Sequence, residues 1–118
     1  MRILVVDDDL LAGEMTSAIL EASGYATLVA ENAIEGFELL DSHADIAMVV
    51  SDLNMPLVSG IEFFRELREQ GSTLPFVLLS GDNAAHLMQE EPGLAACLTK
   101  DFDLADSLPR LVSQLLPS

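Results

Sequence analysis

Short apolar runs that each end in a polar residue are the feature that most constrains the fold of this chain. Four such runs are followed in turn by Asp7-Asp8-Asp9, Asp52, Ser80 and Lys100. Continuous runs of Val, Ile and Leu are typical of strands that are buried on both faces of a parallel sheet. The sequence therefore predicts a parallel sheet whose strands deliver carboxylates, a hydroxyl and an ammonium group at their ends.

Helical patterns alternate with these runs along the whole chain. Strands are expected near 2–7, 26–30, 46–51, 76–80 and 96–99. Helices are expected near 10–22, 32–41, 60–70, 83–90 and 103–116. Uninterrupted alternation of strand and helix predicts an α/β fold, with one parallel sheet and helices on both of its faces.

Apolar residues at helical spacing predict which faces of the helices are buried. The first helix is expected to turn one face to the core, made of Leu11, Met15, Ala18, Ile19 and Ala22. The second helix is expected to bury Ile34, Phe37 and Leu40. Pro109 lacks a backbone N–H, so the last helix should kink there or begin late, with Ser107 as its cap.

Composition limits the classes of function. The chain has 118 residues, which fits one domain, and a net charge of −15, which disfavours direct binding to nucleic acid or to an anionic membrane. No apolar run is long enough to span a bilayer, and the first residues lead straight into a strand, so a cytoplasmic location is expected. The single cysteine, Cys97, excludes an internal disulfide and a cysteine-rich zinc site.

The polar residues at the strand ends are expected to converge at one edge of the sheet. With the strand order 2-1-3-4-5, ligands gather between strands 1 and 3, where the order reverses. Asp7, Asp8 and Asp52 should therefore lie together, with Ser80 and Lys100 completing a ring. Converging carboxylates suit Mg²⁺, and a carboxylate such as that of Asp52 can attack phosphorus to give an acyl phosphate.

The same residues carry a resemblance to a known family. The segments that carry it are 3–9, 51–56 with Gly60, 79–81, and Lys100 with Phe102. They resemble the receiver domain of two-component response regulators, over essentially the whole chain. The resemblance implies a flavodoxin-like (βα)5 three-layer sandwich, a single receiver domain over residues 1–118, and no output domain within the chain.

The resemblance also implies a phosphoryl-transfer role and a metal site. Asp52 would accept a phosphoryl group from a histidine kinase or a phosphotransfer protein, with Mg²⁺ as the cofactor. Asp8 and Asp52 would bind Mg²⁺ directly, Asn54 would bind it through its backbone carbonyl, and Asp7 would act through water. The chain would not be a classical enzyme, although it would take part in its own phosphorylation and dephosphorylation.

Signalling would follow from the phosphoryl group. Lys100 would pair with that group, and Ser80 would move toward it and change the face made by the fourth helix, the fifth strand and the fifth helix. That face would contact a downstream protein or support a phosphorylation-dependent homodimer.

Four positions depart from the family pattern. Asp101 replaces the usual proline, so a trans peptide bond is predicted there, and Cys97 replaces the usual aromatic switch residue. Ser59 stands where Asp is common, and Gly81 stands where alanine is frequent.

Two other classes of function fit parts of the pattern. A phosphatase of the haloacid dehalogenase type would use Asp7 as the nucleophile and Asp9 as the acid and base. A receiver-like interaction module that is never phosphorylated is the other alternative. Identifying which aspartate becomes labelled distinguishes the phosphatase, which would use Asp7, from the receiver, which would use Asp52.

Overall fold

The computed structural model describes residues 1–82, 84 and 86–116, and its ordered elements alternate as the sequence predicts. The strands are β1 (Arg2–Val6), β2 (Ala26–Ala30), β3 (Ile46–Asp52), β4 (Phe76–Ser80) and β5 (Ala96–Thr99). The helices are α1 (Leu10–Ala22), α2 (Ala33–Ser42), α3 (Gly60–Glu69), α4 (Leu87–Glu90) and α5 (Leu104–Leu115). The predicted bounds differ from these by one residue at most, except at α4, whose predicted start at 83 falls on a residue outside the described part.

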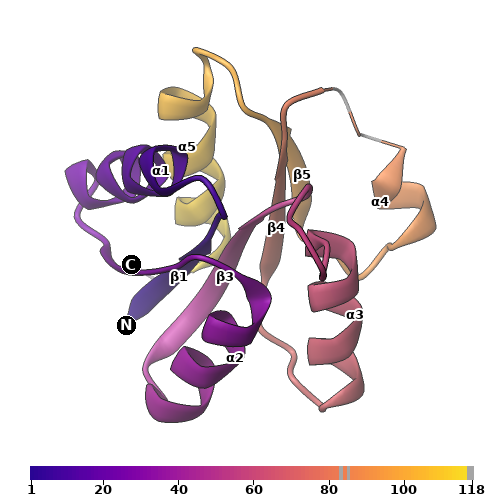
Figure 1. The fold of residues 1–118 in the computed structure, drawn as a ribbon. Helices are drawn as coiled ribbons and strands as arrows, with labels where there is room; N and C mark the ends of the chain where they lie inside the picture. The colour runs from indigo at the N-terminus through magenta and orange to yellow at the C-terminus, as the bar shows by residue number, and fades with distance from the viewer. Residues whose placement is uncertain (83, 85, 117–118) are drawn as a thin grey trace.

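The strands form one parallel sheet in the order β2-β1-β3-β4-β5, so the predicted topology is confirmed. In Figure 1, α1 and α5 lie on one face of the sheet, and α2 and α3 lie on the other. Because all strands run in the same direction, their carboxyl ends meet at one edge, and β1 and β3 lie side by side at its centre. The loops that follow these two strands are therefore neighbours.

Alternate residues of the strands pack into two separate hydrophobic cores, one on each face of the sheet. Leu4 and Val6 of β1 point to the side of α2 and α3, where Phe63 of α3 is fully buried. Ile3 and Val5 point to the side of α1 and α5. Successive side chains of a strand point to opposite faces of the sheet, and helices cover both faces here. A buried parallel strand therefore has no polar face in its sequence.

The expected core face of α1 is wrong at four of its five residues, whereas Ile19 packs against the core on the α5 side of the sheet. Leu11, Met15, Ala18 and Ala22 are exposed and Ile19 is half-buried, while the buried residues are Gly13, Thr16, Ser17 and Leu20. A Cβ atom added to Gly13 would lie 3.3 Å from a methyl carbon of Val29, which shows how closely α1 approaches the sheet. Small residues allow this approach, so the helix packs through them and through Leu20, and leaves Leu11 and Met15 exposed.

The expected face of α2 is wrong at one residue. Ile34 is 59% exposed, whereas Phe37 and Leu40 pack against the core as predicted. The helix begins after Asn32, whose side chain accepts a hydrogen bond from the backbone N–H of Glu35 at 2.8 Å, as an N-cap residue does. Ile34 therefore sits in the first turn, above the edge of the core, and faces outward.

The late start expected for α5 is also wrong. The helix begins at Leu104, and Ser107 lies inside it, donating its backbone N–H to the carbonyl of Asp103 at 2.9 Å. Pro109 is accepted within the helix. Leu104, Leu108 and Val112 are buried against the sheet, so packing of this apolar face outweighs the loss of one backbone donor.

Candidate functional site

Three carboxylates meet at the carboxyl ends of β1 and β3. Val6 pairs with Ser51 in the sheet, which places Asp7 and Asp52 on neighbouring strands at the same level. One oxygen from each of Asp7, Asp8 and Asp52 lies within 4.8 Å of the others. Asp7 is only 2% exposed and Asp52 only 8%, whereas Asp8 is exposed to solvent.

Lys100 reaches this cluster from the end of β5. Its Nζ atom lies 2.7 Å from an Oδ2 of Asp7 and 3.0 Å from an Oδ1 of Asp52. Its backbone N–H donates to the carbonyl of Ser80 at 2.7 Å, which fixes the start of the β5–α5 loop against the end of β4. One ammonium group thus bridges two buried carboxylates.

The charges of this cluster do not balance. Burial raises the pKa of Asp52, the hydrogen bond and charge of Lys100 lower it, and the charges of Asp7 and Asp8 raise it, with the net result above the usual value. For Lys100, burial lowers the pKa, but the contacts with Asp7 and Asp52 outweigh burial and raise it. Both pKa values are therefore raised, which favours the charged form of Lys100 and disfavours the charged form of Asp52. For Asp52, burial outweighs the contact with Lys100, and the charges of Asp7 and Asp8 add to the effect of burial.

Backbone contacts hold the acids in place. An Oδ1 of Asp7 accepts the backbone N–H of Asp9 at 2.9 Å, and the side chain of Asp9 caps α1 by accepting from Leu11 and Ala12. The hydroxyl of Ser51 donates to the carbonyl of Asp52 at 3.0 Å. Asp9 therefore acts as a helix cap through one of its two carboxylate oxygens.

The absence of a Cβ atom at Gly60 allows a close approach beside the site, and the sequence pattern did not predict this role. A Cβ atom at Gly60 would lie 2.4 Å from the carbonyl oxygen of Asp52 and 2.7 Å from a methyl carbon of Leu78. Its backbone N–H donates to the carbonyl of Leu53 at 2.9 Å. The start of α3 is thus pressed against the backbone of Asp52. The signal available in the sequence was a glycine at the first position of a helix that already has Ser59 as its cap.

The remaining predicted site residues lie around the acids. Ser80 is buried at the end of β4, and its hydroxyl accepts the backbone N–H of Asp82 at 3.2 Å. Asn54 is exposed in the loop after β3. Among the described residues there is no cis peptide bond, so the trans bond predicted before Asp101 is confirmed. Cys97 is half-buried beside the α3 core, where burial raises the pKa of its thiol, consistent with a small apolar residue.

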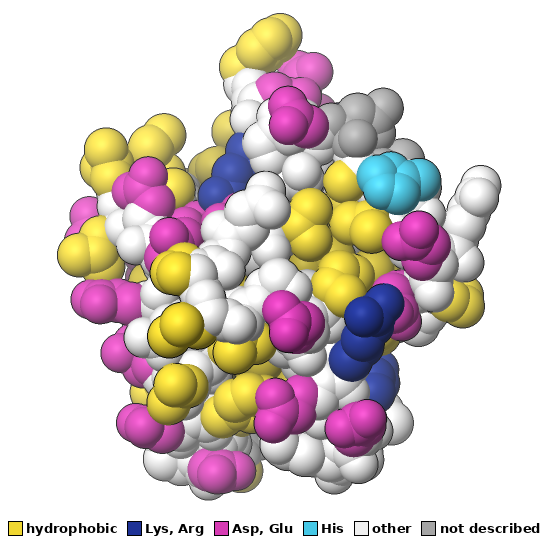
Figure 2. Space-filling model, turned by 45° about the vertical axis from the view of Figure 1, so that its right-hand side comes forward, with side chains coloured by type: hydrophobic (Ala, Val, Ile, Leu, Met, Phe, Trp, Pro, Cys, Tyr) yellow, Lys and Arg dark blue, Asp and Glu magenta, His cyan; other side chains and the backbone are white. Residues whose placement is uncertain are grey.

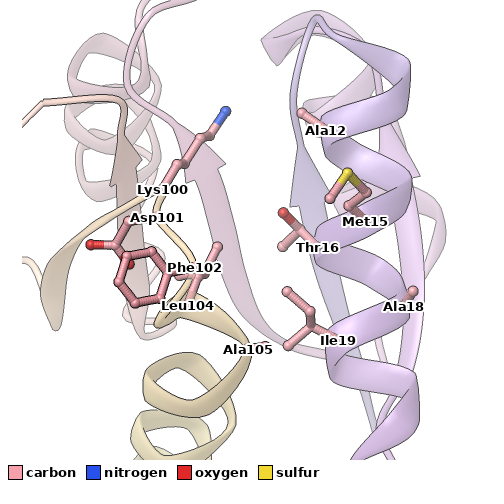
Figure 3. Close-up of a pocket in the computed structure, with 10 residues that line it drawn as sticks. All are labelled: Ala12, Met15, Thr16, Ala18, Ile19, Lys100, Asp101, Phe102, Leu104 and Ala105. Carbon is pink, nitrogen blue, oxygen red and sulfur yellow. The ribbon is translucent and has the colours of Figure 1, made fainter.

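An apolar groove adjoins the site between α1 and the segment 100–105. Figure 3 shows Met15 and Ile19 pointing from α1 toward this segment, where the ring of Phe102 lies. The groove has a volume of about 720 Å³, and the stem of Lys100 forms part of its wall. Three side chains of the expected core face of α1, those of Met15, Ala18 and Ile19, therefore line this groove.

The donor set fits a divalent cation. The cluster offers oxygen ligands alone, which is the set that Mg²⁺ prefers, and it carries more negative charge than Lys100 neutralises. Burial is the main cause of the raised pKa of Asp52, and the charges of Asp7 and Asp8 add to it. A divalent cation beside Asp8 and Asp52 would offset the same repulsion.

Comparison with known proteins decides the family. The family model of the response regulator receiver domain matches residues 3–111. The chain belongs to the response regulator receiver domain family. Receiver domains are signalling domains, consistent with phosphorelay signalling, rather than classical enzymes.

Individual relatives support the receiver assignment. The response regulator Rre1 of Synechocystis sp. is 37% identical over 121 residues, which cover 98% of this chain and 52% of that protein. The chain thus spans about half the length of the curated relatives that it matches. None of the helices in the described part of this receiver domain is long and apolar enough to cross a membrane.

Solved structures share the fold closely. TrrA of Thermotoga maritima, solved in complex with Mg²⁺-BeF, is 30% identical to this receiver domain with a TM-score of 0.87, covering 98% of each chain. The chemotaxis protein CheY4 of Vibrio cholerae is 26% identical with a TM-score of 0.87, again covering 98% of each. Figure 2 shows acidic side chains spread over one face of the domain and few basic ones, in line with the net charge of −15.

Substituting Asp52 by Asn is expected to stabilise the metal-free receiver domain. The raised pKa of Asp52 means that its charged form is less favourable in the folded than in the unfolded chain. A neutral side chain of the same shape should therefore raise the free energy of unfolding near neutral pH, by something on the order of 1 kcal/mol. Urea unfolding with a chelator present measures this, and the exposed Asp41 changed to Asn serves as the control. A lower stability for Asp52→Asn would mean that its contact with Lys100 outweighs its burial.

Proposed function

We propose that the chain is a phosphoacceptor, which takes a phosphoryl group onto Asp52 from a histidine kinase or a phosphotransfer protein. The observation that carries this proposal is the position of Lys100, whose Nζ contacts both Asp52 and Asp7 while Asp8 stays open to solvent. A carboxylate nucleophile, a fixed cation and an open acidic side are the parts that phosphoryl transfer to a carboxylate needs. Membership of the receiver family supports the same role.

Atoms and electrons balance in the proposed transfer, which involves only the phosphorylated donor and Asp52. A carboxylate oxygen of Asp52 attacks phosphorus, an O–P bond forms, and the N–P bond to the donor histidine breaks with its electron pair returning to the imidazole nitrogen. Lys100, which already lies 3.0 Å from an Oδ1 of Asp52, pairs with the transferred group. Ser80, at the end of the next strand, donates its hydroxyl to a phosphoryl oxygen. Water later attacks the acyl phosphate, which releases inorganic phosphate and restores Asp52.

The proposed metal is Mg²⁺, held by the acidic cluster. Asp8 and Asp52 would hold it directly, Asn54 would hold it through its backbone carbonyl, and Asp7 would act through water. The support is the approach of the three carboxylates to within 4.8 Å and the oxygen-only donor set. When bound, Mg²⁺ supplies positive charge beside the phosphoryl oxygens. The complex of TrrA with Mg²⁺-BeF supports this extension to the present chain.

The proposed output is a change at the face made by α4, β5 and α5. The backbone N–H of Lys100 donates a hydrogen bond to the carbonyl of Ser80, which connects the end of β4 to the end of β5. A movement of Ser80 would be passed to this face through that contact. The downstream partner is a protein, with a phosphorylation-dependent homodimer as one form of output. The proposal treats residues 1–118 as a single receiver domain in the cytoplasm, with no direct contact to nucleic acid or membrane.

Intact-mass spectrometry after incubation with acetyl phosphate and Mg²⁺ tests the proposal. The wild-type chain should gain one phosphoryl group, and the gain should require Mg²⁺ and vanish in Asp52→Asn. A gain that survives in Asp52→Asn and disappears in Asp7→Asn would support the haloacid dehalogenase alternative instead. No gain in the wild type, under conditions in which acyl phosphates are stable, would support the module that is never phosphorylated.

A further inference from the structure

The turn between β5 and α5 is built around Lys100, whose ammonium group reaches the acidic cluster. The backbone N–H of Asp101 donates to the carbonyl of Thr99 at 3.0 Å, which closes a three-residue turn with Lys100 at its centre. The N–H of Lys100 itself donates to the carbonyl of Ser80. Two backbone hydrogen bonds therefore fix the main chain at Lys100, and one of them depends on the N–H of the next residue.

Asp101 also organises the chain after this turn. Its Oδ1 accepts the backbone N–H of Asp103 at 3.0 Å, which is the contact of an Asx-turn, a turn that Asp and Asn form readily. Its carbonyl accepts the N–H of Leu104, the first residue of α5, at 3.1 Å. Because Leu104 is buried, these contacts connect the turn at Lys100 to a helix that is packed on the sheet. The N–H, the carboxylate and the carbonyl of Asp101 are thus all engaged in one loop.

The carboxylate of Asp101 does not pair with Lys100. Figure 3 shows the two side chains pointing in different directions. The ammonium group of Lys100 instead forms ion pairs with Asp7 and Asp52, which are buried, whereas Asp101 is exposed to solvent. The backbone is therefore the route by which Asp101 acts on the site.

We propose that Asp101 is a positioning residue, which directs Lys100 to Asp7 and Asp52 through the turn that its N–H and its carboxylate fix. Proline, the usual residue of the family at this position, has no N–H and could not donate to Thr99. Asp101 therefore fixes this turn in a way that proline could not. The inference rests on the proposed function, because the lysine held by the turn is the one that would pair with the phosphoryl group.

The flexible stem of Lys100 makes the position of its backbone important. The Nζ atom lies 2.7 Å from Asp7 and 3.0 Å from Asp52, at the distances of direct hydrogen bonds between charged groups. A fixed main chain at the base of the stem limits the conformations that the side chain must lose to make these contacts. Misplacing a reacting group by about 1 Å can slow a reaction by up to ~100-fold, so a small change in the turn should be measurable.

Three substitutions of Asp101 separate its contacts. Asp101→Asn keeps the N–H and an acceptor for Asp103, Asp101→Ala keeps only the N–H, and Asp101→Pro keeps neither. Asp103→Ala is the matched control, because Asp103 is exposed in the same loop and its side chain makes no capping hydrogen bond. The rate of labelling by acetyl phosphate with Mg²⁺ is followed by intact-mass spectrometry, and urea unfolding with a chelator present measures the stability of each variant.

Labelling should slow by about threefold in Asp101→Ala and by about tenfold in Asp101→Pro, while Asp101→Asn and the control stay within about twofold of the wild type. Equal rates in the wild type, Asp101→Ala and Asp101→Pro would overturn the inference and leave the proposed function intact. Faster labelling in both Asp101→Asn and Asp101→Ala would also overturn it, because the charge of Asp101 would then compete for Lys100. No labelling of the wild type would instead overturn the proposed function.

A double-mutant cycle distinguishes positioning of the lysine from a general loss of stability. In the metal-free chain, Asp101→Ala should destabilise the wild type more than it destabilises Lys100→Met, because part of its effect acts through the lysine. This measurement does not depend on phosphorylation. An equal loss of stability in the two backgrounds would overturn the positioning role, whatever the labelling rates.

Discussion

Gly60→Ala is expected to lower the free energy of unfolding by about 3 kcal/mol, at the upper end for overpacking. The added Cβ would lie 2.4 Å from the carbonyl oxygen of Asp52 and 2.7 Å from a methyl carbon of Leu78. Alanine favours a helix over glycine by ~1 kcal/mol, but that gain is smaller than the cost of the contact with a backbone atom, which has no rotamer to change. Urea unfolding of the two proteins measures the difference.

The same substitution should also slow labelling by acetyl phosphate. Either the start of α3 or the carbonyl of Asp52 must move. That carbonyl belongs to the residue whose carboxylate is the proposed nucleophile. Gly81→Ala is the matched control, because no described atom lies within 4 Å of a Cβ added there. That control should leave stability and labelling near those of the wild type. Unchanged stability in Gly60→Ala would show that the β3–α3 loop yields easily, and that the close approach is not required.

The sequence predicts the sheet and the convergence of the acids for a simple reason. A run such as Ile46–Val50 cannot form an amphipathic surface strand, so it must lie inside a parallel sheet, and the next polar residue must lie at its end. Ser51 is the next polar residue and Asp52 follows it at the end of β3, where the strand order places Asp52 beside Asp7. Strong local pattern and topology act in the same direction here, and the two together determine the position of the site.

The faces of the helices were harder to predict because packing there depends on distance as well as on hydrophobicity. Gly13 and Ser17 bring α1 so close to the sheet that the helix turns Leu11 and Met15 outward. Periodicity alone favours the larger apolar residues as the core face, and so it selected the wrong side. The same limit applies to Ile34, whose place in the first turn of α2 depends on where the chain enters the helix.

Backbone conformation was beyond the sequence pattern in the loops. Leu57 follows Pro56 in a loop where nothing in the residue type indicates a positive φ, since leucine rarely adopts one. The ion pairs of Lys100 with Asp7 and Asp52 could not be predicted either, because they depend on the path of the β5–α5 loop. Both features required coordinates.

Lys100→Met is expected to lower the free energy of unfolding of the metal-free chain by roughly 2 kcal/mol near neutral pH, through loss of a charged hydrogen bond to a buried group. Asp7 is 2% exposed and would lose an ammonium that lies 2.7 Å from its Oδ2. Arg110→Met is the control, since its pair with Asp106 is exposed and should contribute only about 0.3–0.5 kcal/mol. An equal loss in both variants would mean that solvent already screens the buried cluster.

The loss caused by Lys100→Met should grow as the pH rises. Lys100 lowers the pKa of Asp52, which burial and the other acids already hold above its usual value, so removing the lysine raises that pKa further. A carboxyl with a raised folded-state pKa is most favourable to folding below its unfolded pKa, and that stability is lost as the pH rises through the folded value. The variant should therefore approach the wild type near about pH 4 and fall behind it toward neutral pH. Urea unfolding over this range, with a chelator and then with Mg²⁺, measures the effect. Added Mg²⁺ should reduce the loss at neutral pH, because a divalent cation beside Asp8 and Asp52 offsets the same repulsion that Lys100 relieves. A loss that is constant with pH would show that the lysine acts through the packing of its stem in the groove beside α1, and not through the charge of the carboxylates.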